Sequence, residues 1–145
     1  MTGGRQFCTF YLRDDLFGIE SRRVREVFGA RPVTPVPRAP RGVRGLVNLR
    51  GQILLVVDVR ERLALPPRAA EAGVMNLVVE LKDGPVSLLV DRIDDVLDVP
   101  AAGFEAPPST FGARDRELIV GAYKLAGRLL HVLDVDRLVA PAAEG

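Results

Sequence analysis

The sequence contains few side chains of the types that carry out catalysis. His131 is the sole histidine and stands within an apolar run, so a packed strand position is expected for it in place of a general base. Cys8 is the sole cysteine and has no histidine nearby, which predicts a small buried apolar residue. No GxxxxGK or GxGxxG phosphate loop is present. The sequence therefore predicts a protein that is not an enzyme and binds no cofactor.

A cluster of aspartates is the densest set of potential metal ligands. Asp91, Asp94, Asp95 and Asp98 stand close together in the sequence. They lack the glycine and glutamate spacing of a calcium-binding loop. A solvated acidic face without a metal is therefore the expected structure.

The remaining candidate is one arginine in the stretch GLVNLRGQILLVVD, residues 45–58. The apolar run 46–49, a turn around Gly51 and the β-branched and leucine-rich run 53–57 predict a hairpin whose second strand is buried on both faces. Arg50 stands at the turn. Two interpretations are open: Arg50 is a polar cap on a buried hairpin, or it is presented to a binding partner.

The elements that would position these residues are short. Ser21 can cap a helix in which Val24, Val27 and Phe28 share one face, and several prolines predict an extended surface connection over 29–44. The other expected elements are strands at 7–12, 16–19, 75–81 and 86–90, a helix at 59–65, a spacer at 66–73, a connection at 100–116, a hairpin from 117–125 and 128–133, and a helix or turn at 134–139.

The two halves of the chain repeat each other. The early strands align at an offset of 69 residues and the hairpins at an offset of 76, which predicts pseudo-repeat subdomains at about 7–66 and 74–139 and leaves strand exchange between them open. Four or five short strands per copy favour closed barrels. The second copy has Ala126 in place of Arg50 and Lys124 in place of Asn48. Such differences indicate where function has been added to a shared fold.

Composition limits the class of protein. A chain of 145 residues that is 48% hydrophobic suits one domain, or two very small interdependent ones, with a real core. The apolar runs are far shorter than the roughly 20 residues needed to cross a bilayer, and the start MTGGRQFCTF has no apolar signal-peptide core. A cytoplasmic protein without direct membrane insertion is expected.

Charge is distributed unevenly along the chain. Residues 1–68 carry 13 arginines against 6 acidic residues, a net charge of +7, and residues 69–145 carry a net charge of −6. Oppositely charged halves can attract each other or support head-to-tail assembly of similar molecules. An alternative is a small-barrel nucleic-acid binder that uses the arginine-rich half. With two tyrosines, no tryptophan and no alternation of aromatic and basic residues, the sequence argues against nucleic acid.

The segment GLVNLRGQILLVVDVR, residues 45–60, resembles the CheW-like family of chemosensory coupling proteins. The resemblance extends to SRRVREV at 21–27, VDRIDDVL at 90–97 and the closing hairpin within 117–138. It implies a single CheW-like domain over residues 1–145, mainly β, with two intertwined five-stranded SH3-like barrels and short helices. Because the chain stops soon after Leu138, the family's tail helix is expected to be absent.

The same resemblance implies a function and a set of contact residues. The family's adaptors couple the cytoplasmic tips of methyl-accepting chemoreceptors to the regulatory domain of a CheA-type histidine kinase, in arrays where CheW-like domains can form rings. The residues that it implicates in receptor or kinase binding are Val24, Glu26, Val27, Gly45, Asn48, Arg50, Met75 and Val96. For Val24 the alternative is packing of its own helix, and for Glu26 it is a solvated helix face.

Overall fold

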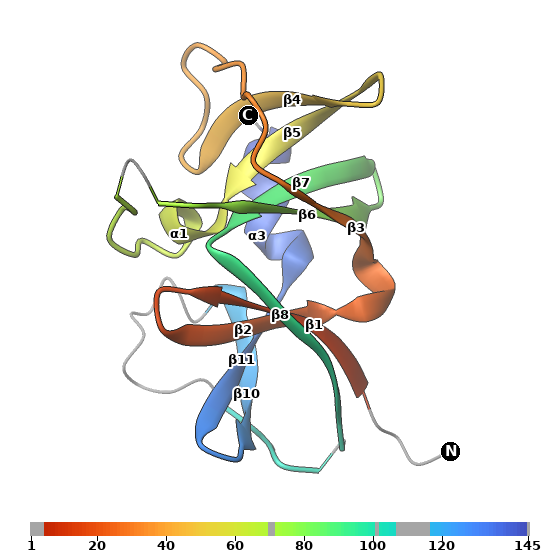
Figure 1. Ribbon diagram of the computed structural model, residues 1–145. Coiled ribbons are helices and arrows are strands. Elements are labelled where there is room, and N and C mark those ends of the chain that lie inside the picture. The colour runs from red at the N-terminus through yellow and green to blue at the C-terminus, as the bar shows by residue number, and fades with distance from the viewer. Residues whose placement is uncertain (1–4, 70–71, 101, 107–116, 145) are drawn as a thin grey trace.

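The computed structural model describes residues 5–69, 72–100, 102–106 and 117–144. Its fold is mainly β, with two sheets arranged one above the other (Figure 1). One sheet is six-stranded in the order β8-β1-β2-β11-β10-β9, and the other is five-stranded in the order β3-β6-β7-β5-β4. The strands are β1 (Arg5–Leu12), β2 (Asp15–Glu20), β3 (Val24–Gly29), β4 (Val43–Leu49), β5 (Gln52–Asp58), β6 (Met75–Leu81), β7 (Gly84–Val90), β8 (Arg92–Val99), β9 (Phe104–Glu105), β10 (Ile119–Leu125) and β11 (Arg128–Leu133).

Each sheet takes strands from both halves of the sequence. β1 and β2 pair with β8 and β11 of the second half, and β6 and β7 pair with β3 and β5 of the first half. If each strand is replaced by its counterpart in the other repeat, the two sheets have the same strand order. The one difference is the short β9, which the six-stranded sheet has in addition. The expected double-barrel architecture is confirmed, and the two sheets are intertwined because neither half forms a sheet alone.

The largest buried cluster lies between the sheets and joins them. Phe10 and Phe17 enter it from the six-stranded sheet, and Leu77 and Leu88 enter it from the five-stranded sheet. Two smaller clusters fill the individual sheets, one around Phe7 and Leu130 and the other around Val47 and Val56. Because burial of apolar side chains is the main favourable term in folding, the shared cluster makes the two barrels mutually dependent.

The helix expected from Ser21 is wrong. A 3-10 turn, η1 (Ser21–Arg23), leads directly into strand β3, which pairs antiparallel with β6. The Ser21 hydroxyl donates to Gln6 Oε1 at 2.8 Å and caps no helix. Val24 and Val27 are β-branched and suit a strand, so pairing with a distant strand overrides a local spacing that also fits a helix.

The last described element is a helix, one of the two alternatives expected at 134–139. α3 (Val135–Glu144) has ten residues and continues past the expected end at 139. Leu138 and Val139 are buried in the cluster between the sheets. The other helix is shorter than expected: α1 (Val59–Arg62) begins where Asp58 Oδ1 accepts a hydrogen bond from the Arg60 N–H at 3.0 Å.

The remaining expected elements are largely confirmed. Both hairpins form, although Ile53 is 57% exposed, so only the later part of β5 is buried on both faces. Most of the connection expected at 100–116 lies outside the described residues. Within the described part of the chain, no helix is both long and apolar enough to cross a membrane.

Candidate functional site

The turn between β4 and β5 is a two-residue turn with a fixed conformation. Arg50 and Gly51 both have positive φ, at 50° and 88°, as a type I′ hairpin turn requires. The Asn48 side-chain oxygen accepts a hydrogen bond from the Gly51 N–H at 2.8 Å. The turn therefore holds Arg50 in one position, and Asn48 has a structural role within the turn.

Arg50 forms an ion pair with Glu26. Its Nη2 atom lies 2.7 Å from Glu26 Oε1 and 2.6 Å from Oε2. Glu26 is on β3 and Arg50 follows β4, and these strands are the two edges of the five-stranded sheet. Arg25 Nη1 also reaches Gln52 Oε1 at 3.3 Å. The sheet therefore curls until its edges meet, and the ion pair lies where they meet.

The electrostatics keep both members of this pair charged. The hydrogen bond from Arg50, aided by its positive charge, holds the pKa of Glu26 below its ordinary value. The hydrogen bond to Glu26 likewise raises the pKa of Arg50. The Arg50 side chain remains 67% exposed. A partner can therefore approach the guanidinium from solvent while Glu26 orients it.

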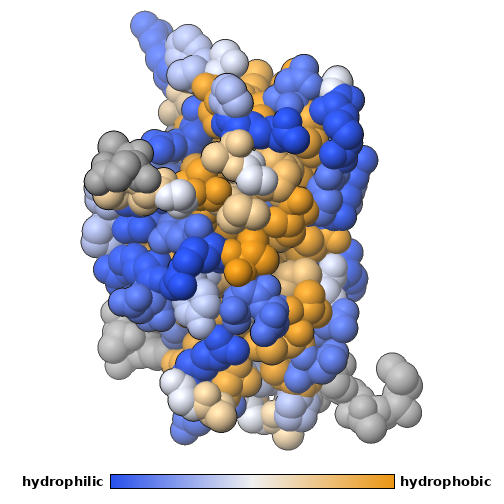
Figure 2. Space-filling view, in the orientation of Figure 1, coloured by the Kyte–Doolittle hydropathy of each residue, from blue (hydrophilic) through white to orange (hydrophobic). Residues whose placement is uncertain are grey.

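Exposed apolar side chains occur on the strands next to this pair. Val27 follows Glu26 on β3 and is 41% exposed, and Ile53, opposite Asn48 on β5, is 57% exposed. In the space-filling view, apolar residues are visible between polar ones on the face across which β8 runs (Figure 2). Sequence reasoning did not single out Ile53, because an unbroken apolar run suggested burial on both faces.

The other expected contact residues differ in burial and in the sheet to which they belong. Val24 and Met75 are half-buried and pack against the cluster between the sheets. Gly45 is buried where Thr34 crosses β4. Val96 is 54% exposed but lies on β8 of the other sheet, opposite Cys8. The structure therefore joins Glu26, Asn48 and Arg50 in one site and leaves Val96 on the other barrel.

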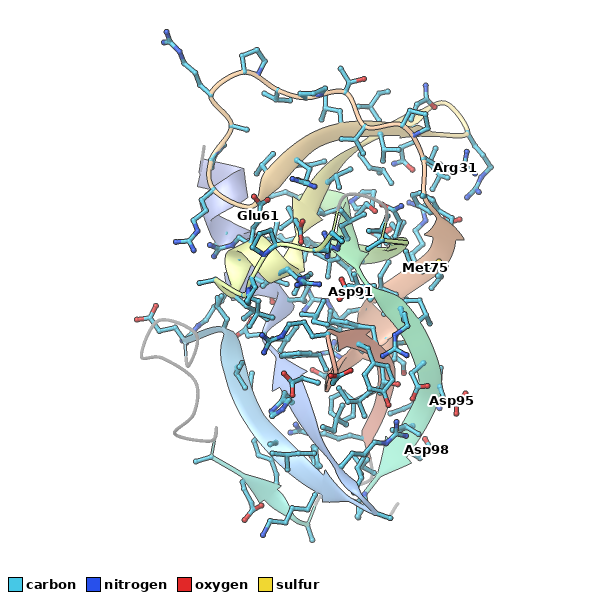
Figure 3. The ribbon with its side chains drawn as sticks, turned by 60° about the vertical axis from the view of Figure 1, so that its left-hand side comes forward. Arg31, Glu61, Met75, Asp91, Asp95 and Asp98 are labelled. Atoms are coloured by element: carbon cyan, nitrogen blue, oxygen red, sulfur yellow. The ribbon has the colours of Figure 1, made fainter. Side chains whose placement is uncertain are left out.

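The expected solvated acidic face is wrong for Asp91, which lies at the junction of the two sheets (Figure 3). Arg68 Nη1 lies 2.7 Å from Asp58 Oδ2, and Arg68 Nε lies 3.0 Å from Asp91 Oδ1. Arg60 Nη1 lies 2.9 Å from Asp91 Oδ2, which also accepts the Arg13 N–H at 2.8 Å. The spacer at 66–73 thus supplies a charged side chain to a largely buried network.

The network keeps its acid ionised in spite of burial. Burial acts to raise the pKa of Asp91, but the hydrogen bonds from the Arg13 backbone and from Arg68, with the charges of Arg68 and Arg60, hold it below its ordinary value. The Asp58 side chain is 3% exposed and that of Arg68 is 8% exposed. Sequence reasoning missed this network.

His131 is packed in the core, as expected from its apolar strand. It is 6% exposed and its ring centroid lies 5.2 Å from that of Phe17. Burial lowers the pKa of His131, and the charge of Asp15 opposes that shift only in part. Cys8 is half-buried and not fully enclosed, and burial raises the pKa of its thiol. Neither side chain has the exposure or pKa expected of an activated catalytic group.

Neutral His131 predicts a loss of stability in mild acid. The unfolded chain takes up a proton near pH 6.5 and the folded chain does so only at lower pH. The free energy of unfolding should therefore fall as pH decreases below about 6.5, by at most about 1.4 kcal/mol per pH unit. His131→Leu, which copies the repeat-related Leu55, should remove this part of the pH dependence. Urea unfolding at several pH values checks the difference, and parallel curves for the two proteins would contradict it.

The structure and the comparisons with known proteins define the class together. Among the described residues, no group of three or more His, Cys, Asp or Glu side chains is placed to hold a metal ion. Two intertwined barrels with an exposed ion pair at a closed sheet edge define a binding protein. A family model described as a CheW-like domain matches residues 6–142, and the chain belongs to that family.

Individual relatives agree with this assignment. The chain is 34% identical to the chemotaxis protein CheW of Rhizobium meliloti, over 98% of this chain and 91% of the relative. It is 30% identical to the chemotaxis protein CheW of Treponema pallidum, over 92% and 81% of the two chains. The crystal structure of the scaffolding protein TtCheW from Thermoanaerobacter tengcongensis matches with a TM-score of 0.82 and 25% identity, covering 92% and 91%. The chain is therefore a non-catalytic adaptor of the chemotaxis type, and nothing supports the nucleic-acid alternative.

Proposed function

We propose that this protein couples methyl-accepting chemoreceptors to the regulatory domain of a CheA-type histidine kinase, in the cytoplasm at receptor arrays. The observation that carries the proposal is the Arg50–Glu26 pair, which is oriented, charged and exposed at the closed edge of the five-stranded sheet. Val27 and Ile53 add exposed apolar area on the same strands. The oriented charge can set a partner's register, while Val27, on the opposite face of β3 from Glu26, and Ile53 can add contact area.

The other candidate residues serve the same function from different positions. Val96 presents an apolar contact on the second barrel, suited to a second partner or to the far side of one partner. Val24, Gly45, Asn48 and Met75 act by holding the shape of the first barrel, since they are buried, half-buried or bonded within the turn. The candidate residues therefore fall into two groups: exposed residues that would touch a partner, and residues that hold the shape of the barrel.

Assembly into rings with related domains is a further part of the proposal. Arg31 lies on the five-stranded barrel, and Asp95 and Asp98 lie on β8 of the other barrel (Figure 3). A basic region on one barrel and an acidic strand on the other supply complementary surfaces for head-to-tail contacts. Such contacts between exposed charges should weaken as salt rises.

Removal of Arg50 should reduce binding to a CheA regulatory domain at least about tenfold, because an oriented charge at an interface sets register and association rate. Charge reversal beside it, Glu26→Arg, should have an effect of at least the same size. Binding of the purified domain to the immobilised full-length chain, measured over a range of salt concentrations, tests both variants. The wild-type affinity should fall as salt rises.

A matched control separates a role in binding from a role in folding. Arg22→Ala removes the same charge from a side chain that is 72% exposed and paired with Glu20. It should leave the affinity unchanged, and urea unfolding should show that Arg50→Ala is folded. Wild-type affinity in both Arg50→Ala and Glu26→Arg would remove this site from the kinase interface.

A further inference from the structure

A cavity of about 720 Å³ opens at the mouth of the five-stranded barrel, and neither Arg50 nor Glu26 lines it. One wall is the proline-rich connection between β3 and β4, and the opposite side includes α1. Figure 3 shows Arg31 where β3 leaves the sheet and Glu61 on the other side of this barrel. The volume lies within the range of about 300–1,000 Å³ that is common for small-molecule sites, which also favour barrel mouths.

Positive charge dominates the lining of the cavity. Four arginines, Arg31, Arg38, Arg41 and Arg44, face one acidic residue, Glu61. Among the described residues, only Arg44 of these four has a carboxylate within ion-pair distance, with its Nε 3.6 Å from Asp58 Oδ2. The Arg31 guanidinium also lies 5.2 Å from the centroid of the Phe28 ring, so Arg38 and Arg41 are the two guanidinium groups that the described contacts leave available for an anion. Guanidinium groups bind phosphate oxygens in a bidentate manner.

Apolar side chains make up part of the lining of the cavity. Val33, Val43, Val74 and Leu89 line it. The buried polar residue there, Asn76, has its amide committed: Nδ2 donates to the Gly29 carbonyl at 3.0 Å, and Oδ1 accepts from Ser87 Oγ at 2.8 Å. A lining of this kind favours an apolar or aromatic body over a hydrated inorganic ion.

The wall that carries the arginines is held in place before any ligand binds. Thr34 and Leu46 exchange two backbone hydrogen bonds, at 2.8 and 2.9 Å. The Asp58 N–H donates to the Gly42 carbonyl at 2.7 Å. Prolines 35, 37 and 40 restrict the backbone between these anchors, and Pro32 precedes the first of them. Little ordering is needed on binding, which favours affinity.

We propose that this cavity binds an organic polyphosphate of nucleotide size, with its phosphates on the arginines and its body against the apolar lining. The proposal is independent of receptor and kinase coupling, and either can fail without the other. An acidic protein segment is a different occupant. The concave volume of about 720 Å³ and the apolar part of its lining favour the small molecule.

Titration calorimetry of the full-length chain with ATP tests the site, with inorganic tripolyphosphate as a probe that has the charge but no organic body. ATP should bind saturably with a Kd below about 1 mM, and more tightly than tripolyphosphate. Arg38→Gln with Arg41→Gln should weaken ATP binding at least about tenfold. The control, Arg5→Gln with Arg22→Gln, removes the same amount of charge from outside the cavity and should change the affinity for ATP little.

A second variant tests the apolar lining. Val74→Phe reduces the space for an organic body, so it should weaken ATP and leave tripolyphosphate unchanged. Equal affinity for ATP and tripolyphosphate would overturn the proposal in favour of a simple anion site. Binding of a polyglutamate peptide in the absence of ATP binding would overturn it in favour of a protein segment. Absence of binding by all three probes, or unchanged ATP binding in Arg38→Gln with Arg41→Gln, would overturn it outright.

Discussion

Asp91→Ala should lower the free energy of unfolding by about 3–5 kcal/mol, a large part of the roughly 5–15 kcal/mol that stabilises a typical domain. The substitution leaves Arg68, whose side chain is 8% exposed, with Asp58 alone, and it removes the carboxylate that pairs with Arg60, whose side chain is 10% exposed. It also removes the acceptor of the Arg13 N–H. The cost arises mainly from the uncompensated charge, because water reaches these guanidinium groups poorly.

Urea unfolding of the wild-type protein and of Asp91→Ala measures this cost. Asp95→Ala is the matched control, because Asp95 is exposed on the same acidic stretch, and it should change the free energy by no more than about 0.5 kcal/mol. Asp91→Asn retains an acceptor for the Arg13 N–H but loses the charge, so the free energy of unfolding that it costs should lie between the costs of Asp91→Ala and Asp95→Ala. A loss below about 1 kcal/mol for Asp91→Ala would show that the network contributes little to stability.

The sequence predicted the elements that depend on local information. Both hairpins were expected because apolar runs flank Gly51 and Gly127, and both glycines have positive φ in the structure. β3 was assigned as a helix because the spacing of Val24, Val27 and Phe28 fits a helical face as well as a strand. The contact that decides between them is the pairing with β6, some 50 residues later. Such long-range pairing is not visible in a local pattern.

The candidate site was predictable for a different reason. Comparison of the two repeats identified Arg50, because Ala126 occupies the related turn. Its partner Glu26 could not be assigned from spacing, since the two meet only when the sheet edges close. The Asp91 network was missed because Arg68 stands in a polar spacer and Asp91 begins an acidic run. Burial of these charges is a property of the junction between the barrels and leaves no periodic pattern.

Gly45→Ala should lower the free energy of unfolding by about 3 kcal/mol. Gly45 has φ of +141°, which a residue with a Cβ rarely adopts. A Cβ there would overlap the Thr34 carbonyl group and lie 3.0 Å from Pro35 Cα, and these are backbone atoms that cannot rotate away. To accommodate it, the connection must move off β4 and lose the two hydrogen bonds between Thr34 and Leu46, each worth about 1 kcal/mol.

The second barrel explains why this cost is built into the fold. Gly121 is the repeat-related glycine, and a Cβ on it would meet Phe104 on β9, which pairs with β10. In both barrels a glycine therefore lets a crossing segment pair with the first strand of a hairpin. Gly29→Ala is the control, because a Cβ at Gly29 meets no described atom within 4 Å and should cost at most about 0.5 kcal/mol. Equal stability of the Gly45→Ala and Gly29→Ala variants in urea would show that the connection yields freely, and that Gly45 does not hold the barrel edge on which Arg50 is presented.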